Sequence, residues 1–100
     1  MNTITKVSDI AYTDVADYLR LGDATADEQN TLKNLLDVAK AFIRSYTGLT
    51  DAQIDEHADF VIVVLILCQD MYDDRTLYVD TTNLNHVVET ILGFHRVNLL

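Results

Sequence analysis

The sequence predicts an all-α fold: a small bundle of four to five helices around one long apolar central helix, with a short β-prone segment near residues 76–82. Three observations support this prediction. The chain of 100 residues has no proline and only three glycines, so few positions break a helix. An apolar stripe with helical spacing begins at Leu32, and an uninterrupted apolar run covers residues 60–68. The length and the 49% hydrophobic content fit a single domain over residues 1–100.

The first half of the chain is predicted to hold two helices. A short one follows Thr13 as its N-cap, because helical spacing relates Val15, Tyr18 and Leu19. The long one begins at Thr25, which forms a capping box with Glu28, and ends before Gly48, which suits a left-handed residue. Its apolar stripe consists of Leu32, Leu35, Leu36, Ala39, Phe42, Ile43 and Tyr46.

The apolar central helix is predicted over about residues 55–73. Thr50 and Gln53 offer a second capping box ahead of it. The branched residues at 60–64 also suit a strand, but no turn residue interrupts residues 52–71 and strands rarely exceed ten residues, so helix is preferred. A helix that is apolar on nearly every side is either central to the fold or part of a subunit contact.

The last part of the chain is predicted to hold a β-prone segment and a final helix. Residues 76–82 could pair only with another strand edge, which makes them a candidate intersubunit strand. The final helix follows Asn83 as its N-cap and carries Leu84, Val88, Ile91 and Leu92.

The charge of the chain argues against nucleic-acid binding. Lys and Arg number 7 and Asp and Glu 16, which gives a net charge of −9 that repels phosphate backbones. No Lys or Arg lies between the acidic residues Asp51 and Asp74. This acidic region is interpreted as a solvated rim, with repulsion of DNA or contact with a basic partner as the functional alternatives.

No catalytic, cofactor or metal site is predicted. The acids around His57 and the acids Asp70, Asp73 and Asp74 would lie about 16 Å apart along one helix, too far to share an ion. The three histidines, His57, His86 and His95, are scattered, and no serine or cysteine has the setting of a nucleophile.

Neither export nor membrane insertion is predicted. The single cysteine, Cys68, is interpreted as a buried thiol. The first residues show no secretory signal and no apolar run spans a bilayer, so we expect a cytoplasmic protein without a membrane segment.

Four stretches of the sequence resemble the tailed-phage head–tail connector family. Together they extend from about residue 13 to residue 96, and their order and spacing also fit, although the chain lacks the prolines usual in that family. The stretches are Tyr18-Leu19-Arg20-Leu21, the segment from Leu36 through Ala39 and Ile43 to Tyr46-Thr47-Gly48, Met71-Tyr72-Asp73-Asp74-Arg75, and Ile91-Leu92-Gly93-Phe94-His95-Arg96.

The resemblance implies a structural virion protein without enzymatic activity. Such proteins form a ring under the portal after DNA packaging and provide the surface on which the tail docks. The expected partners are copies of the same chain in a homo-oligomeric ring that matches the portal symmetry, the portal protein, and a tail-completion or head-closure protein. Assembly would take place in the host cytoplasm, and the final location would be the head–tail junction.

Two sets of residues are candidates for these contacts. Arg75 and Arg96 are expected to form interface ion pairs, and the apolar end of the chain is expected to dock on a neighbour or on the portal. The equally weighted alternative is that Leu99 and Leu100 cover the subunit's own core. The interaction candidates are Phe60, Val64, Leu67, Met71, Tyr72, Arg75, Arg96, Val97, Leu99 and Leu100, and the channel-facing candidates are Asp70, Asp73 and Asp74.

A second function also fits the charge. An acidic helical regulator, such as a DNA mimic that inhibits a host protein, would share the negative charge. A mimic should spread its carboxylates at phosphate-like intervals, whereas here the second half of the chain holds nine acids and two bases and the first half is nearly balanced. This uneven distribution favours the connector.

Overall fold

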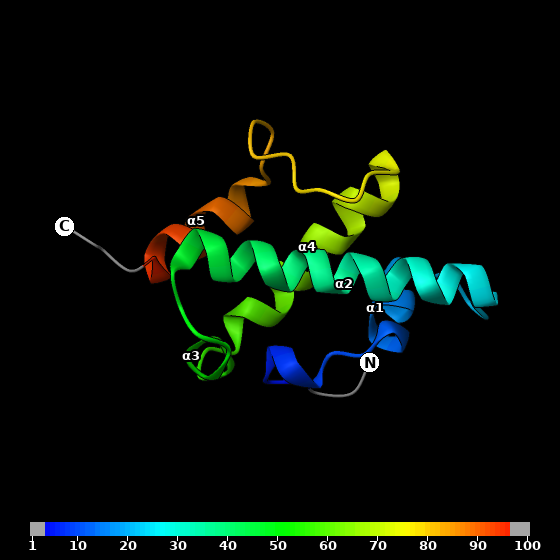
Figure 1. Ribbon diagram of the computed structural model, residues 1–100, viewed down its shortest axis with the longest axis horizontal. Coiled ribbons are helices and arrows are strands. Elements are labelled where there is room, and N and C mark those ends of the chain that lie inside the picture. Colours follow the sequence, from blue (N-terminus) through cyan, green and yellow to red (C-terminus); the bar gives the residue numbers. More distant parts are fainter. Residues whose placement is uncertain (1–3, 97–100) are drawn as a thin grey trace.

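The computed structural model describes residues 4–96 and confirms the all-α prediction (Figure 1). No strand occurs within these residues, and the β-prone segment at 76–82 is a loop. In chain order the elements are a 3-10 helix η1 (Val7–Asp9), α1 (Tyr12–Leu19), α2 (Ala26–Thr47), α3 (Asp51–Asp55), α4 (Asp59–Asp74) and α5 (His86–His95).

The long helix α2 begins and ends where the sequence predicts. The Thr25 hydroxyl accepts a hydrogen bond from the Glu28 amide, and the Glu28 carboxylate accepts one from the Thr25 amide, both at 3.2 Å. Gly48 ends the helix in the left-handed conformation, with φ of 75°. One face of α2 is buried, and its residues are Leu32, Leu35, Leu36, Ala39, Ile43 and Thr47.

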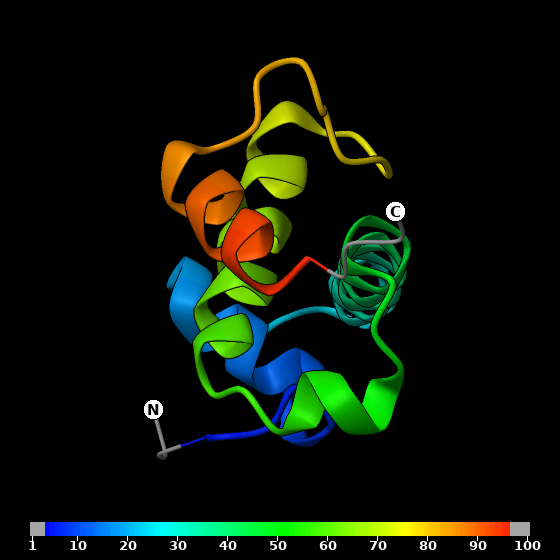
Figure 2. The same cartoon turned by 90° about the vertical axis from the view of Figure 1, so that its left-hand side faces the viewer.

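Helix α4 is the centre of the fold, as predicted, and the helical interpretation of residues 60–64 is confirmed. It packs against α2, α5, α1 and η1. Figure 2 shows α2 nearly end-on, with α4 and α5 together on one side of it. The buried side chains of all these elements form one cluster, to which α4 contributes Phe60, Val61, Val63, Val64, Leu65, Leu67, Cys68 and Met71.

The single helix predicted over residues 55–73 is wrong at its start, because the chain turns between α3 and α4. The capping box of Thr50 and Gln53 is present, but it opens the five-residue helix α3. The amide of Ser8 donates a hydrogen bond of 3.0 Å to the Asp55 carboxylate, and Ile54 is buried beside η1. These contacts hold α3 against the N-terminal segment, so the chain turns before α4 enters the core.

The two predicted caps of the shorter helices are also wrong by two residues. Helix α1 has Ala11 as its N-cap, and the Asp14 carboxylate accepts a hydrogen bond of 2.8 Å from the Ala11 amide. Helix α5 has Asn85 as its N-cap, with its side-chain oxygen accepting from the Val87 amide at 2.8 Å. In α1 a residue of the first turn satisfies the amide of the N-cap, whereas in α5 the N-cap itself satisfies one amide of the first turn.

Helices α1 and α4 end on arginines in the left-handed conformation. Arg20 has φ of 59° and Arg75 has φ of 56°. This backbone region normally favours glycine, because a side chain there is crowded by the carbonyl group.

Among the described residues, no helix combines the length and apolar character that crossing a membrane requires.

Candidate functional site

The prediction of interaction residues is corrected at four positions, because the side chains there are buried. Phe60, Val64, Leu67 and Met71 are 0%, 0%, 1% and 2% exposed, respectively. A side chain that is enclosed by its own subunit offers no surface to a partner. These residues therefore account for the stability of α4 at the centre of the fold, and the subunit-contact alternative does not apply to them.

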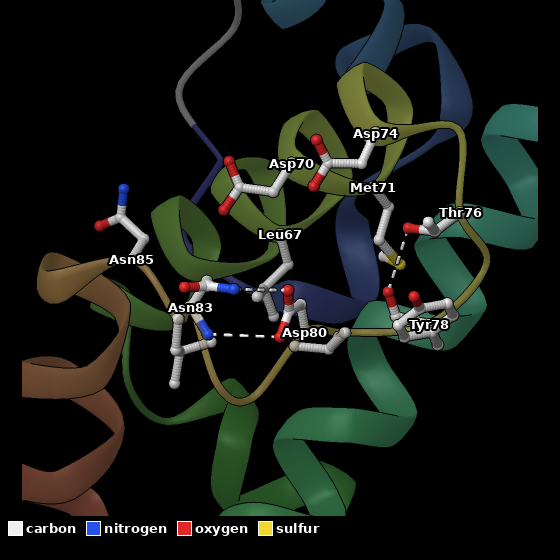
Figure 3. A pocket seen from close by; sticks show the side chains of 11 residues that line it. Leu67, Asp70, Met71, Asp74, Thr76, Tyr78, Asp80, Asn83 and Asn85 are labelled. Carbon is white, nitrogen blue, oxygen red and sulfur yellow. Dashed lines mark hydrogen bonds between the residues drawn. The ribbon is translucent and has the colours of Figure 1, made fainter.

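The acidic residues at the C-terminal end of α4 border a pocket of about 240 Å³ (Figure 3). Asp70 and Asp74 line it from the helix, and Asp80 and Asn83 line it from the following loop. Burial raises the pKa of Asp70, and the nearby charges of Asp74 and Asp73 raise it further. All three channel-facing candidates, Asp70, Asp73 and Asp74, have exposed side chains and lie at the C-terminal end of the helix.

The loop side of this pocket is organised by Asp80. Its carboxylate accepts hydrogen bonds from the Asn83 side chain and from the Thr82 amide, each at 3.0 Å. These bonds, with the Asn83 side chain as the largest cause, hold the pKa of Asp80 below its usual range. None of the described residues that line the pocket is Lys or Arg, so the pocket is lined by acidic and uncharged side chains, although the exposed Arg75 follows Asp74 directly at the end of α4.

Tyr72 and Arg75 lie beside a second, mostly apolar groove of about 330 Å³. The groove lies between the C-terminal end of α4 and α2, which contributes Thr31 and Leu35. Tyr72 is half-buried and Arg75 is exposed. Unlike the four core residues, these two candidates are therefore accessible for the contacts predicted from the sequence.

Arg96 has a contact within its own chain. Its guanidinium lies over the Tyr46 ring, 5.3 Å from the ring centroid, and the arginine is exposed. This contact joins the end of α5 to α2. The remaining interaction candidates, Val97, Leu99 and Leu100, lie outside the described residues.

Several large apolar side chains are exposed, and only some of them lie in segments that were predicted to make contacts. Phe94 is 87% exposed and Val87 50% exposed, both on α5, and neither was a candidate. Leu77 and Tyr78, in the loop after α4, are 55% and 62% exposed and belong to the predicted β-prone segment. A helical-wheel count on the short helix α5 would have placed Phe94 away from Val88 and Leu92, which face the core.

The structure also brings together two histidines that the sequence analysis treated as scattered. His57 lies in the turn before α4, and His95 is the last residue of α5; their ring centroids are 4.3 Å apart. Asp59, the first residue of α4, has its Oδ2 atom 2.7 Å from the His95 Nε2 atom. His86 begins α5 and is not part of this group.

Comparison with known proteins leaves the family of this chain open. No family model, curated protein or solved structure matches the sequence or the fold.

Proposed function

We propose that this chain is a non-enzymatic structural protein of a tailed phage or prophage, which forms the head–tail connector ring under the portal and provides the surface for tail docking. The family resemblance of the sequence is the origin of this proposal. The observation that carries it is the presence of exposed apolar side chains at the two opposite ends of α4. In the assembled particle the chain would lie at the head–tail junction.

The two exposed surfaces suit head-to-tail contacts between copies. The first is the loop patch, Leu77 and Tyr78, which follows the C-terminal end of α4. The second is Phe94, which precedes His95 and so lies near the N-terminal end of α4. A helix of 16 residues is about 24 Å long, so the two surfaces are well separated. Two different surfaces that meet generate a ring when the rotation between subunits closes.

The acidic end of α4 supports a surface that faces DNA without binding it. Asp70, Asp73 and Asp74 would line the channel. Their negative charges cannot neutralise the phosphates of DNA, so contact with DNA would release none of its counterions and the DNA would not adhere. Replacement of these three residues by Asn should leave ring assembly intact and alter DNA retention or ejection. Unchanged ejection would contradict the channel assignment.

The proposal is tested by measuring assembly directly. The purified chain, alone and mixed with a phage portal protein, is examined by native mass spectrometry, co-sedimentation and negative-stain electron microscopy. We expect rings, or co-sedimentation with the portal, that Phe94→Ala or Leu77→Ala weakens. Ile62→Ala is the matched control, since Ile62 is an apolar residue on α4 that is 38% exposed and belongs to neither proposed surface.

Two results would contradict the connector proposal. If the chain stays monomeric at all concentrations and does not bind the portal protein, it has no connector function. If such a chain instead binds a DNA-binding host protein in competition with DNA, the acidic-regulator alternative is correct.

A further inference from the structure

We propose that His57, Asp59 and His95 form a zinc-binding site in which the ion joins the start of α4 to the end of α5. One potential ligand atom from each residue lies within 4.8 Å of the others. Two imidazole nitrogens and one carboxylate oxygen form a donor set typical of zinc sites with three protein ligands. This inference does not rest on the connector function, since none of the three residues is proposed to contact another subunit or DNA, although the exposed Phe94 ring lies 5.5 Å from the His95 ring.

The distances are close to those that a bound ion requires. Zinc lies about 2.0–2.2 Å from nitrogen and oxygen ligands, so tetrahedral ligand atoms are about 3.3 Å apart. The distance of 2.7 Å between Asp59 Oδ2 and His95 Nε2 has to lengthen slightly. The two distances that involve His57 are at most 4.8 Å, and each has to approach the tetrahedral value. The site therefore requires rotation of the side chains, and neither the His57 nor the Asp59 side chain is buried.

The core of the protein anchors the backbone that carries Asp59 and His95. Phe60 follows Asp59 and is fully buried, and its ring lies 4.8 Å from the His95 ring and 5.8 Å from the His57 ring. On α5, Val88 and Leu92 are also fully buried, which fixes this helix against the core. Ligands on packed elements lose little conformational freedom when an ion binds.

The exposure of the group leaves one side open for a fourth ligand. The His95 side chain is 15% exposed, whereas that of Asp59 is 46% exposed. Water can therefore reach the ion on the Asp59 side and complete a tetrahedron, as it does in zinc sites that keep an open position. Zinc is favoured over magnesium and calcium, which prefer sites made of oxygen ligands alone.

An ordinary hydrogen bond between Asp59 and His95 is the simpler explanation of the 2.7 Å contact. Such a bond involves only two residues, and it gives no role to His57, whose ring lies beside that of His95. The two explanations differ in what His57 contributes. An experiment on His57 therefore separates them.

The test uses the full chain, purified without a polyhistidine tag and stripped of metal with a chelator. Zinc chloride and magnesium chloride are titrated separately by calorimetry, and thermal unfolding is followed with each ion. We expect one zinc ion per chain, no magnesium binding, and a rise in Tm of roughly 10 °C when free zinc exceeds its Kd about 100-fold.

The variants identify the ligands. Loss of even an outer partner of a metal ligand weakens binding about 10- to 100-fold, so His57→Gln and Asp59→Asn should each weaken zinc binding at least tenfold. His86→Gln is the matched control and should leave the affinity unchanged, because His86 is exposed at the other end of α5. Asp59→Asn retains an oxygen that accepts a hydrogen bond, so it answers the question even if His57→Gln does not fold.

Cobalt provides an independent measurement. Co²⁺ bound at this site should give the visible absorption of a tetrahedral complex in the wild type and lose it in Asp59→Asn. The thiol does not interfere, because Cys68 is buried and burial raises its pKa to about 12. Absence of zinc binding, a zinc affinity in His57→Gln or Asp59→Asn equal to that of the wild type, or equal weakening by His86→Gln would overturn the proposal.

Discussion

The two ends of α4 differ in their polar groups: a carboxylate lies beside two imidazoles at one end, and three carboxylates lie on the helix at the other. At the N-terminal end, Asp59 lies beside His57 and His95, which come from a turn and from another helix. At the C-terminal end, Asp70, Asp73 and Asp74 come from one helix, and the pocket that Asp70 and Asp74 border has no basic residue in its lining. The pKa of Asp70 is raised there, by burial and by the two neighbouring carboxylates.

This difference concerns the arrangement of the acidic residues and not their number. Like charges on one helix repel each other and attract only diffuse counterions. A single carboxylate beside two imidazoles offers a directed set of ligands. The first arrangement suits a surface that repels DNA, and the second suits the capture of one ion.

The largest expected effect is on the packing beneath the histidine group. Phe60→Ala should lower the free energy of unfolding by about 3–5 kcal/mol, because it leaves a cavity beside the His95 ring. Urea unfolding followed by circular dichroism measures this change. Ile62→Ala, at a partly exposed position of the same helix, is the control; a similar small loss in both variants would contradict the role of Phe60 in the core.

The next effect is the direct interaction between Asp59 and His95. A double-mutant cycle with Asp59→Ala and His95→Ala, carried out with a chelator present, should give a coupling energy of about 0.5–1 kcal/mol, because the pair is partly exposed. Strictly additive losses would mean that the contact contributes nothing to stability without metal.

At the other end of α4, removal of a charge should stabilise the protein. Because the pKa of Asp70 is raised in the folded state above its ordinary value of 3.8, its carboxylate destabilises the fold at neutral pH. Asp70→Asn should therefore increase stability there by a few tenths of a kcal/mol, a small value because solvent screens this group.

The same substitution has a defined pH dependence. The penalty from Asp70 is absent below pH 3.8, where both states are protonated, and grows as the pH rises through the raised pKa. The stability difference between Asp70→Asn and the wild type should follow the same course in urea unfolding at a series of pH values. A difference that is independent of pH would contradict the assigned cause.

The smallest effect on stability is expected for the exposed aromatic residue near the histidine group. Phe94→Ala should change the free energy of unfolding by no more than about 0.5 kcal/mol, because Phe94 is 87% exposed. It contrasts with Phe60→Ala, the same substitution in the core. Measured at low protein concentration, a loss as large as that of Phe60→Ala would mean that Phe94 packs within its own chain.

Local signals in the sequence were sufficient for the central part of the fold. The capping box at Thr25 and Glu28, the left-handed Gly48 and the apolar stripe between them predict α2 closely. The absence of turn residues around residues 60–64 correctly favours a helix over a strand. These signals depend on neighbouring residues, and they are therefore readable without the fold.

The errors concern contacts between distant residues. The break between α3 and α4 accompanies a hydrogen bond from Ser8 to Asp55, which are 47 positions apart. Asp59 and His95, 36 positions apart, meet only because α4 and α5 pack together. The burial of Phe60 and Met71 within the subunit could not be separated from burial at an interface, because both give the same apolar pattern.

The left-handed arginines Arg20 and Arg75 have a consequence for the chain's charge balance. They are two of only seven basic residues in a molecule with net charge −9, and each occupies a backbone conformation that glycine would adopt with about 1 kcal/mol less strain. Exchanging either for glycine would relax the backbone and make the molecule more acidic. Each of the two helix ends therefore carries one of the few positive charges of the chain at a position where glycine would be less strained.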